Sequence, residues 1–254
     1  MTTTTKIAVV TGGSRGLGRN MALRLAEKGN DIILTYNSNK TEADKVVAGI
    51  RDMGRKAEAM QLDTADSKGL DAFLKKVSEH LEQHTGSDKF DFLVNNAGTA
   101  AHHPIAETPE QTIDEMYNIH LKGVFLLTEK SIPYLNDNGR IINISSGLTR
   151  FSLPGYAAYA SMKGAIEVFT RYLAKELGSR GITANTVAPG LTETDFTRPF
   201  LPSSEEGMQK VESIFALGRV GRPEDIGGVV AWLCTDDARW VTAQRIEVSG
   251  GQLL

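Results

Sequence analysis

The sequence predicts an α/β protein with a doubly wound fold, in which helices cover both faces of one parallel seven-stranded sheet. Short β-branched runs alternate with longer helical patterns along the chain, as expected for strands joined by crossover helices. Runs such as Ile32-Ile33-Leu34 and Ile141-Ile142-Asn143-Ile144 lack the alternation of a half-exposed strand, so both faces should be buried. Because no linker, repeat or change of composition divides the 254 residues, we expect a single domain over 1–254.

The strands are expected at seven runs separated by helical patterns or turns. They are Ile7 to Val10, Asp31 to Tyr36, Lys56 to Leu62, Phe90 to Val94, Arg140 to Ile144, Ile182 to Val187 and Arg245 to Val248. Parallel strands require crossovers, which accounts for the long helical patterns between them. The least regular stretch is Leu191 to Gly221, where Pro199 and Pro202 precede a helical pattern over 205–217. We expect this stretch, at about 191–221, to form a lid over the substrate.

Composition and charge exclude several classes of protein. A formal net charge of -3 gives no general attraction to nucleic acid or to an anionic membrane, and no stretch reads as a membrane span. The single cysteine, Cys234, lies in an apolar run and is expected to be a buried thiol in a cytoplasmic protein. Residues Met1 to Thr5 lack the pattern of a signal peptide. The adjacent His102 and His103 have no third ligand at metal spacing, so no metal site is predicted.

A glycine-rich loop connects the first strand to the first helical pattern. It reads Thr11-Gly12-Gly13-Ser14-Arg15-Gly16-Leu17-Gly18, and helical character follows over 19–28. Glycine lets the backbone approach a pyrophosphate, and a helix N-terminus offers unpaired N–H groups and a favourable dipole. The alternative is a glycine turn without a ligand, which the strand and helix on either side disfavour. The residues predicted to bind a dinucleotide here are Gly12, Ser14, Arg15, Gly16, Leu17 and Gly18.

Polar residues also close the third and fourth strands, at the same edge of the sheet. Asp63 follows the third strand, where its carboxylate could accept a hydrogen bond from an adenine amino group or simply be a solvated loop residue. Asn95-Asn96-Ala97-Gly98 closes the fourth strand and could brace the glycine loop or meet the cofactor ribose, although alone it would read as a turn. Asn95, Ala97 and Gly98 are therefore predicted to be cofactor-binding residues.

The candidate catalytic residues are Ser146, Tyr159 and Lys163. Tyr159-Ala160-Ser161-Met162-Lys163 lies in a helical pattern running to about Leu177, so Tyr159 and Lys163 share one face. A neighbouring ammonium, and an oxidised nicotinamide ring, would lower the pKa of the phenol and let it act as an acid/base. Tyr-x-x-x-Lys alone is a weak signal, but Ser146 ends the fifth strand, where its hydroxyl could bind the substrate oxygen.

Taken together, these residues resemble the short-chain dehydrogenase/reductase family in its shorter form. The resemblance covers essentially the whole chain and implies a Rossmann-type fold. Its motifs are matched in order by Thr11-x3-Gly16-x-Gly18, Asp63, Asn95 to Gly98, Ser146, Tyr159, Lys163, and Pro189-Gly190 with Thr194.

The resemblance also implies a role for each matched residue. Ser146 would stabilise the substrate and Tyr159 would be the acid/base. Lys163 would bind the nicotinamide ribose and lower the pKa of Tyr159. The segment after Pro189-Gly190 would hold the nicotinamide carboxamide through the backbone of Thr192 and the hydroxyl of Thr194.

The sequence departs from the family pattern at His120. Family members usually carry Asn before the stretch that aligns with Leu121 to Phe125, and Asn118 points to another side of the helix. We hypothesise that His120 keeps the proton relay behind Lys163 and adds a titrating group. The alternative is a packed or solvent-facing histidine without a proton role.

The cofactor is predicted to be NADP, with NAD less favoured. An acidic residue after the second strand would bind the ribose diol and repel a 2′-phosphate, but Asn37 begins the polar run Asn37-Ser38-Asn39-Lys40 at this point. Arg15 in the glycine loop adds a positive charge, although it could equally be a solvated loop residue.

The predicted function is hydride transfer between NADP(H) and a ketone or secondary alcohol, as in carbonyl reductases and alcohol dehydrogenases. The alternatives are a cofactor-binding regulator without turnover, and a dehydratase or epimerase. The substrate pocket is expected beside Gly147 to Leu153 and under the lid, with His102 and His103 possible at its edge. Phe151, Leu153, Phe196, Phe200 and Leu201 would form its apolar wall or, equally, pack the lid onto the body of the protein. The resemblance also implies a homotetramer, with the helices that start near Pro109 and Gly155 packing between subunits.

Overall fold

The computed structural model describes residues 5–254 apart from the side chain of Phe200. Residues 1–4, part of the segment considered for a signal peptide, lie outside this range. Within it, seven strands form one sheet in the order β3-β2-β1-β4-β5-β6-β7. Each neighbouring pair is parallel. The predicted doubly wound fold is thus confirmed. Strands β2 and β3 are added on one side of β1 and strands β4 to β7 on the other, so the strand order reverses between β1 and β4, where such folds bind their ligands.

The strands and helices alternate along the described chain. The strands are β1 (Ile7–Val10), β2 (Asp31–Tyr36), β3 (Ala57–Gln61), β4 (Phe90–Asn95), β5 (Leu135–Ile144), β6 (Thr183–Pro189) and β7 (Arg245–Val248). The α-helices are α1 (Gly16–Glu27), α2 (Lys40–Asp52), α3 (Leu70–Thr85), α4 (Glu110–Tyr117), α5 (Gly123–Ser131), α6 (Ala157–Leu177), α7 (Glu205–Glu212) and α8 (Pro223–Leu233). Over residues 5–254, no helix combines the length and the apolar character needed to cross a membrane.

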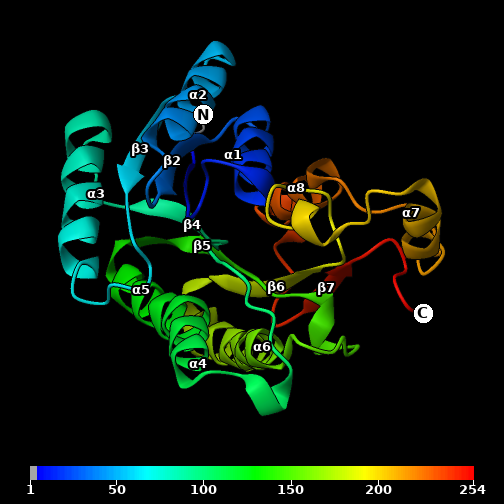
Figure 1. Cartoon of the computed structure of the whole chain (residues 1–254). Coiled ribbons are helices and arrows are strands. Elements are labelled where there is room, and N and C mark those ends of the chain that lie inside the picture. Colours follow the sequence, from blue (N-terminus) through cyan, green and yellow to red (C-terminus); the bar gives the residue numbers. More distant parts are fainter. Residues whose placement is uncertain (1–4) are drawn as a thin grey trace.

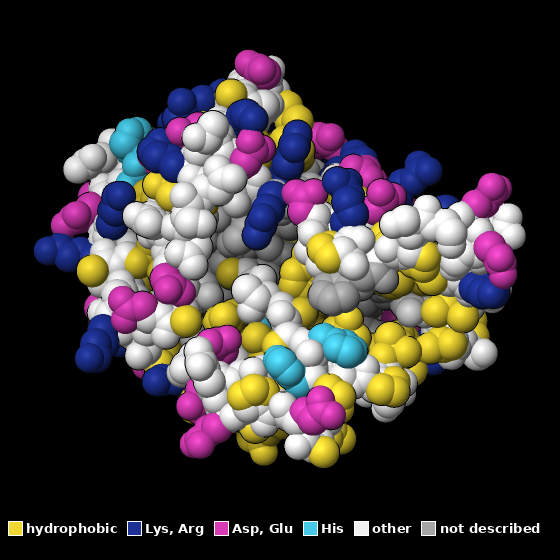
Figure 2. Space-filling view, viewed as in Figure 1, with side chains coloured by type: hydrophobic (Ala, Val, Ile, Leu, Met, Phe, Trp, Pro, Cys, Tyr) yellow, Lys and Arg dark blue, Asp and Glu magenta, His cyan; other side chains and the backbone are white. Residues whose placement is uncertain are grey.

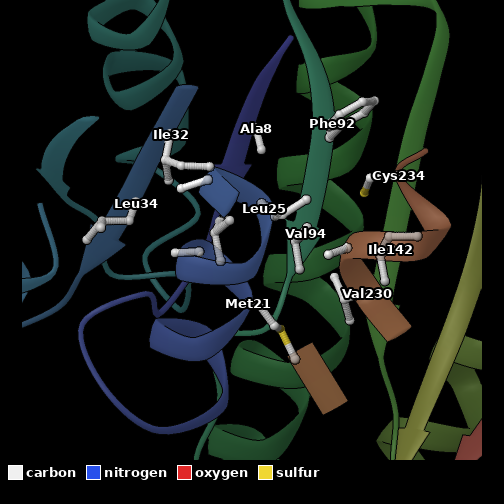
Figure 3. Packing of buried hydrophobic residues seen from close by; sticks show 14 of the residues in the cluster. Ala8, Met21, Leu25, Ile32, Leu34, Phe92, Val94, Ile142, Val230 and Cys234 are labelled. Atoms are coloured by element: carbon white, nitrogen blue, oxygen red, sulfur yellow. The ribbon is translucent and has the colours of Figure 1, made fainter. Parts of the chain in front are cut away.

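The helices form two layers, one on each face of the sheet (Figure 1). One core cluster joins α1, α2 and α8 to the sheet, and Met21 of α1 lies toward Val230 of α8 in this layer (Figure 3). The other cluster joins α3, α5 and α6 to the opposite face. Cys234 is buried in the first cluster, as predicted. Because helices cover both faces of the sheet, the carboxyl ends of the strands, which carry the predicted site, are the part that stays accessible.

The largest differences from the predicted bounds are five residues, at the start of β5 and at the end of α7, and in both the cause is long-range pairing. β5 begins at Leu135 rather than Arg140, although the polar run at 136–139 is typical of a turn. Leu135 pairs with Phe90, and the register shifts before Arg140 pairs with Phe92, with Asn138 at a positive φ of 61°. The irregular start of the strand therefore depends on its neighbour β4.

Helix α7 ends at Glu212 rather than near Leu217. The residues that follow pair with the C-terminal segment: Ala216 N donates to Gly251 O at 3.2 Å, and Leu253 N donates to Ile214 O at 2.8 Å. These bonds use backbone groups that a longer helix would need for itself. The C-terminal segment thus fixes where the helix stops.

Candidate active site

The predicted site residues lie at the carboxyl ends of neighbouring strands. The glycine loop follows β1, the segment 95–98 ends β4 and Ser146 follows β5, while Gly190 to Thr194 follow β6. On the face shown in Figure 2 the surface is hollowed at the centre, with Lys and Arg side chains along the upper edge and hydrophobic side chains at the lower right. The structure therefore gathers the segments that the sequence placed at one edge.

The glycine loop has the shape of an anion cradle. Gly12 and Gly16 have positive φ values of 64° and 55°, which side chains other than glycine rarely adopt. The extended Arg15 precedes α1 and provides no side-chain cap for its first turn. Uncapped N–H groups at a helix start suit a phosphate, so the loop fits the pyrophosphate of a dinucleotide. Leu17 packs its side chain against the core.

Gly18 is required by the packing of the loop itself. A Cβ atom at this position would lie 2.2 Å from Gly12 O and 2.4 Å from the Asn96 side-chain nitrogen. Both distances are far inside van der Waals contact, and the nearer atom belongs to backbone that cannot rotate away. Any side chain at position 18 would therefore displace the loop.

The end of β4 braces this loop through Asn96. Asn96 Nδ2 donates to Thr11 O at 3.0 Å and to Gly12 O at 3.2 Å. The Thr11 hydroxyl in turn accepts from Asn96 N at 2.9 Å and from Ala97 N at 3.0 Å. The predicted bracing is therefore present, but the side chain that provides it was not among the predicted site residues.

The role predicted for Asn95 needs correction as far as its side chain is concerned. That side chain is 4% exposed and donates to Thr128 Oγ1 at 2.9 Å and to Asn143 Oδ1 at 2.8 Å. It lies inside the protein and does not face the glycine loop. Successive residues at a strand end point to opposite sides, and this alternation is the signal that could have identified Asn96.

The residues predicted for the adenosine end lie after β2 and β3. Asn37 and Asp63 are both exposed. Asn37 O accepts from Gln61 Nε2 at 2.8 Å, which ties the two strand ends together. Asp63 Oδ1 accepts from Ala65 N at 2.9 Å. Asp63 thus shapes its own turn, and its exposure leaves the other carboxylate oxygen within reach of solvent or a ligand.

The two ends of the predicted lid, at 191–193 and at Gly221, are hydrogen-bonded to each other. Gly221 N donates to Leu191 O at 3.0 Å, and Glu193 N donates to Gly221 O at 2.8 Å. Gly190, whose N–H donates to Val248 O at 3.0 Å, fixes the start of the segment to β7. The base of the predicted lid is therefore a closed loop held on the sheet.

Two threonines predicted to hold the cofactor, Thr192 and Thr194, lie at the base of the predicted lid. Thr192 is buried, and its hydroxyl donates to Gly190 O at 3.0 Å. Thr194 lies over the glycine loop, since a Cβ atom at Gly16 would lie 3.7 Å from Thr194 Cβ. The structure thus brings Thr194 beside the loop predicted to hold the pyrophosphate.

Ser146, Tyr159 and Lys163 come together between β5 and α6. Ser146 follows β5, and its hydroxyl accepts from Leu148 N at 3.2 Å and is hydrogen-bonded to the Tyr159 hydroxyl. Tyr159 lies in the first turn of α6, and Lys163 lies one turn later. Lys163 Nζ donates to Ile144 O at 2.8 Å and lies 5.6 Å from the centre of the Tyr159 ring. A serine, a phenol and an ammonium therefore share one small region.

Burial dominates the electrostatics of this region. It raises the pKa of Tyr159 to about 12, against the opposing effect of the hydrogen bond with Ser146. It also lowers the pKa of Lys163 to about 8. In the protein alone, burial thus outweighs the expected lowering of the phenol pKa by Lys163. At neutral pH the phenol is therefore protonated, and this is the form that can donate a proton.

His120 is buried beside Tyr159 in a π-helical turn at Asn118–Lys122. The two rings meet edge to face with their centres 5.0 Å apart. His120 Nε2 lies 2.8 Å from Thr99 O, and because a carbonyl only accepts, this nitrogen carries the proton. Nδ1 is buried without a hydrogen-bond partner among the described residues. Gly98 makes room for the ring, since a Cβ there would lie 2.6 Å from His120 Cε1.

The structure argues against a titrating role for His120. Burial, and then the charge of Lys163, lower the pKa of His120 to about 2. The imidazole is therefore neutral at any pH at which the protein would work. The hypothesis that His120 adds a titrating group is not supported, whereas a place for His120 in the proton relay stays a prediction.

The predicted apolar wall is only partly formed by the side chains described. Phe151 packs on the Ser146 side of the site, because a Cβ at Gly147 would lie 2.9 Å from its ring. Leu153 and Phe196 are 42% and 44% exposed. The side chain of Phe200 lies outside the described residues. Over residues 5–254, no group of three or more His, Cys, Asp or Glu side chains is arranged to hold a metal ion.

Known proteins resemble this chain over nearly its whole length. A family model described as enoyl-(acyl carrier protein) reductase matches residues 12–252. A 3-oxoacyl-[acyl-carrier-protein] reductase, FabG, of Staphylococcus aureus is 38% identical over 252 residues, which cover 98% of this chain and 99% of the relative.

Solved structures of ketoreductases have the same fold. The promiscuous reductase LugOII, which catalyses keto-reduction at C1 during lugdunomycin biosynthesis, gives a TM-score of 0.92 at 37% identity and covers 98% of both chains. The angucycline C-6 ketoreductase LanV, solved with bound NADP, gives a TM-score of 0.91 at 34% identity and covers 98% of this chain and 95% of its own. These likenesses, together with the geometry of the strand edge, show that the chain belongs to the short-chain dehydrogenase/reductase family of oxidoreductases.

Proposed function

We propose that the protein is an NADP(H)-dependent ketoreductase that acts on a small-molecule ketone, with Tyr159 as the acid/base. The observation that carries the proposal is the convergence of Ser146, Tyr159 and Lys163 beside the glycine loop. At neutral pH the buried phenol is protonated, which is the form that can donate a proton to a substrate oxygen during reduction. Binding alone would not require this set of groups, which argues against a regulator without turnover.

Each of the three residues has a distinct task in the proposed reaction. When bound, NADPH supplies a hydride to the carbonyl carbon of the substrate. The Tyr159 phenol donates its proton to the substrate oxygen, and the Ser146 hydroxyl donates a hydrogen bond that stabilises the charge developing there. Lys163, held by Ile144 O, keeps a positive charge near the phenol and favours the phenolate left after proton transfer.

NADP fits the residues at the cofactor side of the site. The end of β2 carries Asn37 where a carboxylate would repel a 2′-phosphate, and the solved ketoreductase LanV holds NADP. The proposed contacts come from the glycine loop, the strand ends and the lid base. They are Gly12, Ser14, Arg15, Gly16, Leu17, Gly18, Asn37, Asp63, Ala97, Gly98, Pro189, Gly190, Thr192 and Thr194, with Tyr159 and Lys163 at the ribose.

Replacing Asn37 by Asp should turn the cofactor preference toward NADH. A carboxylate about 4 Å from a phosphate charge costs about 1–4 kcal/mol at effective dielectric constants of about 80 to 20, which corresponds to a loss of about fivefold to about 700-fold in kcat/KM for NADPH. The measurement is kcat/KM with NADPH and with NADH. Asn37→Ala is the matched control, because it removes the amide without adding charge. Equal losses in both variants would count against a 2′-phosphate at this position.

The substrate class is tested with a panel of ketones and NADPH, following cofactor absorbance. Angucycline ketones are the first candidates, because the neighbour LanV is an angucycline C-6 ketoreductase. A 3-oxoacyl thioester is the second, because FabG is 38% identical. Turnover of either identifies the class. NADPH binding without consumption across the whole panel would contradict the proposal and favour the regulator, while loss of water from a hydroxylated substrate would favour a dehydratase.

His120→Asn, which restores the residue usual in the family, should leave the shape of the pH profile of ketone reduction unchanged between pH 5 and pH 7. The reason is that an imidazole with a pKa of about 2 does not titrate in this range. Reduction should instead decline above about pH 8, as Lys163 loses its proton. A step near pH 6.5 present in the wild type and lost in the variant would restore His120 as a titrating group.

We also propose a homotetramer with α4 and α6 at subunit contacts. Both helices carry large apolar side chains that the single chain leaves exposed, among them Ile113, Tyr117, Val168 and Tyr172. Burying such side chains between copies would remove apolar surface from water. Light scattering should give about four times the 27.6 kDa of the chain, and Tyr172→Glu should reduce that mass. A monomer at micromolar concentration would contradict this assembly.

A further inference from the structure

A polar network lies directly behind Ser146, centred on Glu167 of α6. Glu167 Oε1 accepts from Ser145 Oγ at 2.7 Å and from Arg245 Nε at 2.8 Å. Thr149 Oγ1 lies 2.7 Å from the same oxygen. Ser145 and Thr149 flank Ser146 along the chain, one residue before it and three residues after it. One carboxylate oxygen thus holds both sides of the short segment that carries Ser146.

Arg245 of β7 completes the network from the opposite side. Its Nη2 donates to Ser146 O at 3.3 Å and to Thr149 Oγ1 at 3.0 Å. The backbone of Ser146 and both of its flanking hydroxyls are therefore connected to one Glu–Arg pair. The Ser146 hydroxyl itself is left to Leu148 N and to Tyr159.

The position of Glu167 links this segment to the other two proposed catalytic residues. It lies four residues after Lys163 and eight after Tyr159, so all three share one side of α6. The side chains of Glu167 and Arg245 are 14% and 24% exposed, so water competes only weakly with their ion pair. The pair joins α6 to β7, and the hydrogen bonds that Glu167 and Arg245 also make hold the segment 145–149 between these two elements.

We propose that Glu167 and Arg245 are positioning residues, which hold the segment 145–149 so that the Ser146 hydroxyl stays directed at Tyr159 and the substrate oxygen. The inference rests on the proposed function, because it concerns how the serine of that site is held. Neither residue would touch the substrate. Their effect would pass through Ser146 to the acid/base.

The chemical consequence concerns the proton of Tyr159. The hydrogen bond from Ser146 favours the phenolate and so lowers the pKa of Tyr159. The other titratable groups beside the phenol are Lys163 on α6 and His120 in the π-helical turn, and neither contacts Glu167 through its side chain. Loosening the segment should therefore raise the pKa of Tyr159 without changing these two neighbours.

The test is alcohol oxidation with NADP⁺ as a function of pH, because this direction requires the phenolate. Glu167→Gln should lower kcat about tenfold and move the half-maximal pH upward by about half a unit or more, while KM for NADP⁺ stays within about twofold. Arg245→Met should give the same shift. Because the two residues act as one unit, the double variant should lose no more than either single variant.

Glu247→Gln is the matched control. Glu247 also pairs with Arg245, with Nη1 to Oε2 at 3.0 Å, but its other partners are Arg150 and Ser249 rather than the segment 145–149. It should leave the half-maximal pH unchanged. A merely structural role for Glu167 would lower the thermal midpoint and the amount of active protein, but it would not move the pH profile.

Ser146→Ala distinguishes failure of the proposed function from failure of the positioning inference. If Ser146→Ala retains full turnover, the proposed function fails at this residue. If Ser146→Ala loses turnover while Glu167→Gln and Arg245→Met keep the wild-type pH profile, the positioning inference is wrong and the proposed function stands. An upward shift shared by Glu167→Gln and Arg245→Met, and absent in Glu247→Gln, supports the inference.

Discussion

Tyr159→Phe is expected to lower the rate of ketone reduction roughly 10³-fold while NADPH still binds. General acid catalysis by a positioned side chain contributes about 10²–10⁴-fold, and the variant removes only the hydroxyl that donates the proton. The ring that meets His120 edge to face is kept, so the fold around α6 should be preserved. Turnover is followed by NADPH absorbance at saturating substrate, and binding by NADPH fluorescence.

Tyr156→Phe is the matched control for this prediction. Tyr156 lies three residues earlier at the start of α6, but the residue four positions after it is Ala160 rather than a lysine. Its variant should keep turnover within a few-fold of the wild type. If Tyr156→Phe loses turnover and Tyr159→Phe retains it, the proton donor is Tyr156 rather than Tyr159, and the proposed mechanism is overturned.

Gly18→Ala should weaken NADPH binding by about 100-fold or abolish it. The added methyl group would lie 2.2 Å from Gly12 O, so the loop backbone must move out of its cradle shape. Overpacking of this kind costs about 1–3 kcal/mol, and a binding loss of about 3 kcal/mol corresponds to about 100-fold in Kd. The measurement is the Kd for NADPH by fluorescence titration, together with the thermal midpoint without cofactor.

Gly228→Ala provides the comparison. Gly228 lies within α8, and a Cβ there meets nothing within 4 Å. Because alanine favours a helix interior over glycine by about 0.5–1 kcal/mol, this variant should bind NADPH normally and melt slightly higher. Equal binding losses in the two variants would show that the effect is not specific to the glycine loop.

Elements held by local pattern were predicted closely, and those held by distant partners were not. β1 and β2 have their predicted bounds, because apolar runs buried on both faces are visible in the sequence. β7 also has its predicted bounds, although its four residues are only partly buried. The early start of β5 depends on its pairing with β4, and the early end of α7 depends on the C-terminal segment. Neither partner is adjacent in sequence, so no local pattern indicates the boundary.

The site divides in the same way. The order of the strand ends brings Ser146 and the glycine loop to one edge, and helical spacing puts Tyr159 and Lys163 on one face. By contrast, the motif 95–98 does not by itself indicate which asparagine faces the loop, and it is Asn96 rather than Asn95 that braces it. The Glu167–Arg245 pair joins residues 78 positions apart, and no motif in the sequence points to it.

The sequence by itself determined which groups stand at the carboxyl edge of the sheet, since strand ends and helical periodicity are local properties of the chain. Only the tertiary structure decided how those groups ionise. Burial is the main cause of all three pKa values, which are about 12 for Tyr159, about 8 for Lys163 and about 2 for His120. Burial at any one residue is the sum of atoms brought from distant parts of the chain, and it changes the free energy of a charge more than any neighbour along the sequence does.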